Sequence, residues 1–226
     1  MMNRIVKARV LAVVAGAALA ASACGSPDVG SRIPRASVSS ATTEPPLVTA
    51  PAPTGKSVGA APADLHDVDW ARVPVPGDFC GVPGLVTFKG GEATATSRTW
   101  GPVHLFRRDE GMVYGDIEGD QRSEAAVSVG CDNGGGTAAG QLAFAFVVFE
   151  GVQGRLIAIG TVTPQKNPPD QHTTLLWKLQ MTRGRLIAHE NWYRPMDPTC
   201  CPTGKAETIW TVKDGHLTPG APHITS

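Results

Sequence analysis

The sequence predicts an all-β fold, built as an antiparallel sandwich or partly closed barrel of about eight to ten strands. Short apolar runs separated by turn residues fill positions 65–218, and none shows helical periodicity over the roughly 12 residues that a helix needs. The 26 Gly and 19 Pro among 226 residues interrupt every candidate helix. With 42% hydrophobic residues, the chain can bury a core.

Gly-containing turns divide this region into strand-like runs. The turns ending at Gly154 and Gly184 each join two long apolar runs, which predicts two hairpins. Asp214-Gly215 is a further turn signal. The expected strands are the runs 85–88, 103–106, 112–114, 124–129, 142–149, 156–163, 173–181, 186–192 and 208–212.

Alternation with period two predicts which side chains face the core. Trp177 belongs to one alternating set and is therefore expected in the core. The two sets are Leu142, Phe144, Phe146 and Val148 in the first hairpin, and Leu175, Trp177, Leu179 and Met181 in the second.

Residues 1–23 have the pattern of a secretion signal. A basic segment with Arg4, Lys7 and Arg9 precedes the apolar run 10–19, and small residues follow. The apolar stretch is shorter than the roughly 20 residues that cross a bilayer. We therefore expect this segment to be cleaved.

The tetrad Ala21-Ser22-Ala23-Cys24 resembles a bacterial lipobox, in which a lipid is attached to the cysteine. Parity supports the resemblance, because four of the five Cys lie in the predicted domain and can pair, which leaves Cys24 over. A multiply acylated Cys24 would anchor the chain to a membrane. Simple secretion after Ala23 is the alternative.

Residues 24–64 are rich in Ala, Pro, Ser and Thr, the composition of a disordered stalk. Such a segment of about 40 residues spans roughly 35 Å and would hold a domain away from a membrane. We expect one domain over 65–218 and a disordered tail over 219–226. The 20 basic and 20 acidic residues balance, which argues against nucleic acid as a partner.

An acidic loop precedes one of the predicted strands. Its spacing resembles the D-x-D-G-D-x-x-x-D loop of FG-GAP/VCBS repeats, and the resemblance implies a structural Ca²⁺. The alternative is an acidic turn whose carboxylates accept backbone N–H groups. An EF-hand is excluded because Gln121 stands where that loop requires Gly. The candidate calcium ligands are Asp116, Glu118, Asp120 and Glu124.

The four cysteines of the domain are expected to form disulfides in an exported chain. Because Cys200 and Cys201 are adjacent, they either bond to each other or reach separate partners. We favour Cys80–Cys131, which closes a loop of about 50 residues, together with a vicinal Cys200–Cys201 bond. A redox role for the vicinal pair is the functional alternative to a structural one.

No nucleophile elbow, S-x-x-K motif or His-based metal spacing occurs in the sequence, so no catalytic residue is assigned. We interpret His189-Glu190 as an exposed dipeptide at a strand end. Trp192, Tyr193 and Arg194 form a candidate ligand surface for a glycan or a peptide.

Three segments resemble a group of uncharacterised actinobacterial secreted proteins and lipoproteins: GDIEGDQRSEAAVSVGC, GGGTAAGQLAFAFVVF and WYRPMDPTCCPTG, the last with a CCP-[ST]-G element. The resemblance covers much of residues 78–217 and implies a location in the cell envelope.

We therefore expect a non-enzymatic extracytoplasmic β domain, lipid-anchored at Cys24, that binds an envelope protein or a glycan. The second hypothesis is an exported hydrolase that uses carboxylates such as Asp116 and Glu124, and the third is a calcium-stabilised scaffold. Convergent polar groups of shifted pKa in a deep pocket would favour the hydrolase.

Overall fold

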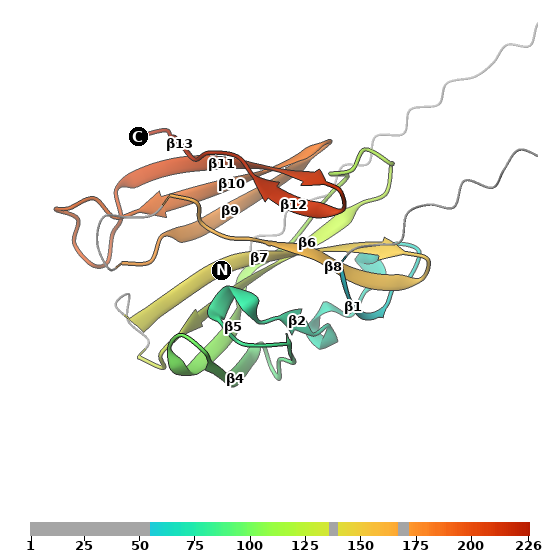
Figure 1. Ribbon diagram of the computed structural model, residues 1–226, viewed down its shortest axis with the longest axis horizontal. Coiled ribbons are helices and arrows are strands. Elements are labelled where there is room, and N and C mark those ends of the chain that lie inside the picture. Colours follow the sequence, from blue (N-terminus) through green and yellow to red (C-terminus); the bar gives the residue numbers. More distant parts are fainter. Residues whose placement is uncertain (1–54, 136–139, 167–171) are drawn as a thin grey trace, which may run out of the picture. The chain divides into compact units, whose positions relative to one another are not determined.

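Two large antiparallel sheets and one small two-stranded sheet make up the domain in the computed structural model, which describes residues 55–135, 140–166 and 172–226 (Figure 1). Its strands are β1 (Lys56–Ala60), β2 (Val75–Pro76), β3 (Leu85–Val86), β4 (Glu92–Ser97), β5 (Gly101–Gly115), β6 (Glu124–Asp132), β7 (Gln141–Val152), β8 (Arg155–Val162), β9 (Leu175–Thr182), β10 (Arg185–Trp192), β11 (Gly204–Lys213), β12 (His216–Pro219) and β13 (His223–Ile224). The first sheet has the order β1-β8-β7-β6-β5-β4, and the second has β12-β11-β10-β9, with β13 beside β11. The all-β prediction is confirmed, although the described residues form 13 strands.

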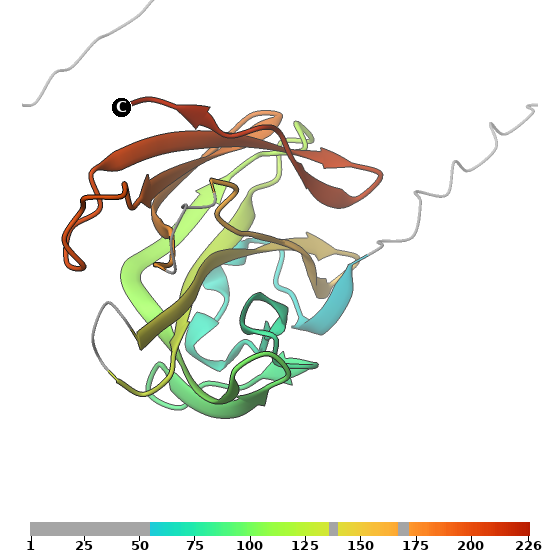
Figure 2. The ribbon, with the colours of Figure 1, turned by 60° about the vertical axis from the view of Figure 1, so that its left-hand side comes forward.

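The first sheet is covered on both faces (Figures 1 and 2). One face packs on the N-terminal segment, which holds β2, β3 and three single-turn 3-10 helices, and the other packs on the second sheet. The first eight residues of β6 are all buried, because this central strand lies between two apolar layers. The helices are η1 (Leu65–Asp67), η2 (Trp70–Arg72) and η3 (Asp78–Cys80).

Strand β7 supplies both apolar layers because its side chains alternate. Phe144, Phe146 and Val148 lie between the two sheets, on one face as the alternation predicts. Val147 and Phe149 point the other way, toward the N-terminal segment. Complete burial of each such side chain contributes roughly 1.5–3 kcal/mol. Strand β7 therefore stabilises the packing on both faces of the first sheet.

Two of the hairpin turns have positive φ angles at both central residues. Gln153 and Gly154, between β7 and β8, have φ angles of 50° and 74°. Asp214 and Gly215, between β11 and β12, have φ angles of 51° and 73°. Two consecutive positive φ angles mark the type I′ turn, whose twist matches that of paired strands.

The runs 103–106 and 112–114 belong to one long strand, β5, rather than to two. Its pairing with β6 shifts between Arg107 and Met112, where Gly111 has a φ of 75°. The glycine therefore changes the register without ending the strand.

The domain extends beyond its predicted limits at both ends. Residues 56–60, expected within the stalk, instead form β1, which pairs with β8. The tail expected to be disordered over 219–226 instead pairs β13 with β11, and the backbone N–H of Lys205 donates to the carbonyl of Ser226 at 2.9 Å. Both segments are short, and their pairing partners lie far away in the sequence, so neither gives a local signal of a strand.

The predicted signal, Cys24 and most of the stalk lie outside the described residues, which begin at Gly55. Within the described residues, no helix is long and apolar enough to cross a membrane.

Trp177 is 45% exposed, in contrast to the core position that its alternation predicts. The register of β9 against β10 shifts between His189 and Glu190, so that Trp177 is an extra residue in β9. Such a bulge reverses the alternation on one side of it. The buried residues of β9 are consequently Leu176 and Leu179.

Both favoured disulfides are present. Cys80–Cys131 joins η3 to β6 across 51 residues of sequence, with both cysteines fully buried. Cys200–Cys201 is the vicinal bond, in the connection between β10 and β11. The first bond therefore fixes the N-terminal segment to the centre of the first sheet.

Candidate functional site

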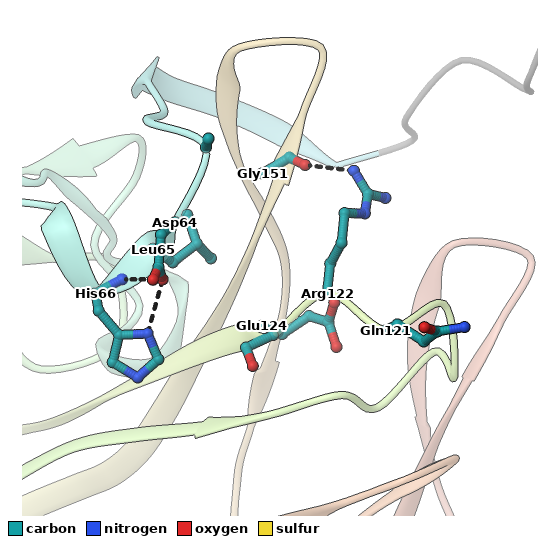
Figure 3. Close-up of a pocket in the computed structure, with 9 residues that line it drawn as sticks. Asp64, Leu65, His66, Gln121, Arg122, Glu124 and Gly151 are labelled. Carbon is teal, nitrogen blue, oxygen red and sulfur yellow. Dashed lines mark hydrogen bonds and ion pairs between the residues drawn. The ribbon is translucent and has the colours of Figure 1, made fainter. Parts of the chain in front are cut away.

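A small polar depression of about 330 Å³ lies where the N-terminal segment meets the acidic loop (Figure 3). Three parts of the chain line it: residues 63–66, residues 121–124 and Gly151 of β7. Its ionisable side chains are those of Asp64, His66, Arg122 and Glu124.

Asp64 and His66 form a hydrogen-bonded pair at one side of the depression. Asp64 caps η1: its Oδ1 accepts the backbone N–H of His66 at 2.9 Å and lies 2.7 Å from the Nδ1 of that imidazole. These hydrogen bonds lower the pKa of Asp64. The imidazole stacks on Tyr114 at 3.9 Å, and the Tyr114 hydroxyl accepts from the indole N–H of Trp70 at 2.9 Å. The ring of His66 is thus held on two sides.

Glu124 lies at the floor of the depression, at the start of β6. It is only 2% exposed, and its Oε2 accepts the backbone N–H of Ile117 at 2.7 Å. Burial, together with the negative charges of Glu118 and Asp120, raises the pKa of Glu124 to about 7. Burial also raises the pKa of Glu118 and of Glu150, with further contributions from neighbouring carboxylates. The carboxyl of Glu124 can therefore take up or release a proton near neutral pH.

Arg122 neutralises part of this acidic surface. Its Nη2 lies 2.6 Å from Oδ2 of Asp120, and its Nη1 donates to the carbonyl of Gly151 at 3.1 Å (Figure 3). The ion pair with Asp120 raises the pKa of the Arg122 guanidinium. The arginine therefore ties the acidic loop to β7 along the edge of the depression.

The acidic loop satisfies most of its carboxylates internally. The carboxylate of Asp116 accepts the backbone N–H groups of Gly119 at 2.5 Å and of Asp120 and Gln121 at 3.1 Å each. Gln121 has a φ of 71°, which lets the loop curl around that carboxylate. This is the hydrogen bonding expected of the acidic-turn alternative.

The candidate calcium ligands do not form a common set of ligands. Asp116 and Glu124 each accept backbone N–H groups, and Asp120 is paired with Arg122. Among the described residues, no three His, Cys, Asp or Glu side chains are placed together to hold a metal ion. These carboxylates are therefore engaged by backbone N–H groups and by Arg122, and calcium binding stays a prediction from the resemblance.

The candidate ligand surface at Trp192 is only partly exposed. Tyr193 is buried (3%) and its hydroxyl donates to the carbonyl of Thr199 at 2.8 Å, so the prediction of a surface aromatic is wrong for this residue. The Trp192 ring contacts two cations, with Nζ of Lys166 at 4.6 Å and Cζ of Arg194 at 5.7 Å from its centroid. The aromatic faces are therefore partly occupied by the protein itself.

Glu190 is fully buried, in contrast to the prediction that His189-Glu190 is an exposed dipeptide. Its carboxylate accepts the backbone N–H groups of Gln165 at 3.0 Å and Lys166 at 2.7 Å, and the hydroxyl of Thr208 at 2.6 Å. Glu190 thus connects the segment after β8 to the second sheet.

The sequence interpretation missed Asp64 and His66 because it placed Asp64 in the stalk. An Asp directly before a short apolar turn is the pattern of an N-cap, and that signal was available. Trp177 was missed because a bulge in β9 cannot be read from alternation alone.

The fold and these sites define a disulfide-linked all-β domain with a small polar depression between its N-terminal segment and its acidic loop. No protein family model, no curated protein and no solved structure matches this chain.

Proposed function

We propose that this chain is an exported, lipid-anchored β domain that binds a component of the cell envelope without chemical turnover. One observation carries the proposal: no described element covers the outer face of the second sheet, and that face exposes Trp177 and Ile209 at 45% and 46%. Exposed aromatic side chains on an otherwise polar surface are typical of binding sites. The basic and apolar N-terminal residues and the lipobox resemblance support the location.

The location is tested by mass spectrometry of the N-terminus of the mature chain. We expect an acylated Cys24 and recovery of the chain with membranes. Cys24→Ser should release the chain into the soluble fraction, because the substitution removes the site of lipid attachment. An unmodified N-terminus on the membrane-associated wild type would contradict the proposal.

The binding function is tested by incubating the exported chain with fractionated envelope material. We expect retention of a polysaccharide or protein fraction, and no turnover of it over hours. Release of cleaved fragments would refute a purely binding role.

A second function, hydrolysis, is favoured by one specific observation. Glu124, with a pKa of about 7, lines the same depression as the Asp64–His66 pair. A carboxyl that titrates near neutral pH, in the same depression as an imidazole, is a combination that general acid–base catalysis uses. We expect such a hydrolase to cleave chromogenic esters or glycosides, and to lose activity in both Glu124→Gln and His66→Asn. Absence of turnover between pH 5 and 9 would eliminate this candidate.

A calcium-stabilised scaffold remains the third proposal. The measurement is the thermal midpoint with Ca²⁺ and with a chelator, since a ligand that binds only the folded state raises that midpoint. An unchanged midpoint would reject it.

A further inference from the structure

The outer face of the second sheet faces away from the first sheet (orange to red in Figure 2). In β10 the buried residues Leu186, Ala188 and Glu190 point inward, so the residues between them point outward. The outward residues opposite them in β11 follow from the register, in which His189 pairs with Glu207 and Asn191 with Lys205. This outer face consists of Trp177, Lys178, Ile187, His189, Asn191, Lys205, Glu207 and Ile209.

Trp177 lies beside two pairs of interacting polar side chains, Lys205–Asn191 and His189–Glu207. Its ring lies 5.6 Å from the imidazole of His189, in a tilted arrangement. Nζ of Lys205 lies 5.9 Å from the Trp177 ring centroid and donates to Oδ1 of Asn191 at 2.9 Å. Nδ1 of His189 lies 3.1 Å from Oε1 of Glu207. The indole is thus exposed, and the side chains around it are held in place by one another.

This composition suits a sugar chain better than a protein partner. The exposed apolar groups, Trp177 and Ile209, are not joined into one broad patch, because His189 and Glu207 lie among them. A protein partner would favour a contiguous apolar centre. A pyranose ring offers an apolar C–H face for the indole and hydroxyls for the surrounding polar groups.

The charge of the face indicates the kind of sugar chain. Lys178 and Lys205 form no ion pair within the described residues, whereas Glu207 is paired with His189. Lys178 is exposed, directly follows Trp177 in β9 and lies opposite His189, while Nζ of Lys205 lies over the Trp177 ring. The two lysines outnumber the one carboxylate of this face, Glu207, and their surplus of positive charge complements a ligand that carries negative charge.

We propose that the outer face of the second sheet binds an anionic polysaccharide of the cell envelope. The indole of Trp177 stacks on a sugar ring, and Lys178 and Lys205 contact its acidic groups. The inference rests on the proposed binding function and names its ligand class.

The test is native affinity electrophoresis of the exported chain in gels that contain polygalacturonate. We expect retardation by polygalacturonate that weakens with salt, and at least tenfold weaker retardation by the methyl-esterified polymer, which has the same backbone without the charge. Trp177→Ala should weaken binding at least tenfold. Trp100→Ala is the matched control, because Trp100 is 42% exposed and precedes β5 in the first sheet, and it should leave binding unchanged.

The lysines are tested by the double variant Lys178→Gln/Lys205→Gln, with Lys213→Gln as the control at the far end of β11. We expect the double variant to bind weakly and to lose most of the salt dependence. Equal binding of the neutral polymer, or full binding by Trp177→Ala, would overturn the inference. Capture of envelope material that persists in Trp177→Ala would overturn it while leaving the proposed binding function intact, and failure to capture anything would overturn both.

Discussion

Glu124→Gln should stabilise the domain at neutral and alkaline pH but not at acid pH. The folded state holds the proton of Glu124 with a pKa of about 7, against an ordinary value of 4.5. Between these two pH values the folded state binds more protons than the unfolded state, so the stability of the wild type falls as pH rises from about 4.5 to about 7. Gln carries no charge at any pH, so the variant does not lose stability in this way as the pH rises.

The magnitude follows from the difference between the two pKa values. At about 1.4 kcal/mol for each pH unit, the upper limit is about 3 kcal/mol. Solvent from the neighbouring depression screens the carboxylate and reduces the expected effect to about 1–2 kcal/mol. The charges that act on this carboxyl are those of Glu118, Asp120 and Arg122.

The assay is urea unfolding of the wild type and of Glu124→Gln at several pH values between 4 and 8.5. The stability difference between them should be smallest near pH 4 and reach its full size above pH 7. Any loss of stability that the amide causes by itself is the same at every pH. The readout is therefore how the difference in free energy of unfolding between the two proteins changes with pH. Asp78→Asn, at an exposed carboxylate of η3, is the control for the loss of a surface carboxylate. A pH-independent difference for Glu124→Gln would refute the reasoning.

Two further predictions concern covalent and steric constraints. Replacing both Cys80 and Cys131 with Ala should cost about 4 kcal/mol, because that bond closes 51 residues. Replacing both cysteines of the vicinal bond with Ser should cost far less stability in the same urea titration, since the vicinal bond closes almost no loop. Equal losses of stability in the two double variants would contradict this entropic explanation. The second prediction is steric: Gly115→Val should cost about 1–3 kcal/mol by overpacking, because a Cβ there would lie 2.7 Å from the Cβ of Met181. Gly59→Ala, with open space around it, is the control, and thermal midpoints that fall equally would disprove the steric explanation.

Much of the fold could be predicted because its signals are local. The turn at Gln153-Gly154 and the long apolar run of β7 are contained in a few neighbouring residues, and each specifies a hairpin by itself. Cys80 and Cys131 could be paired because the other two cysteines are adjacent, which leaves few alternatives.

The errors occurred where a distant partner decides the structure. β1 looks like part of the stalk until β8 completes its hydrogen bonds. Trp177 follows a core alternation that a single extra residue reverses, and Glu190 looks exposed until Gln165, Lys166 and Thr208 surround its carboxylate. None of these contacts is encoded in the residues next to the one affected.

The amino-acid sequence by itself determined the β class and the turns, because backbone preferences and alternation act over a few residues. Only the tertiary structure decided which side chains meet at a site. It brought His66 and Glu124 to one depression and placed Trp177 beside Lys205 on an uncovered face. Burial and charge at these places depend on segments far apart in the chain, so they exist only after the two sheets have packed.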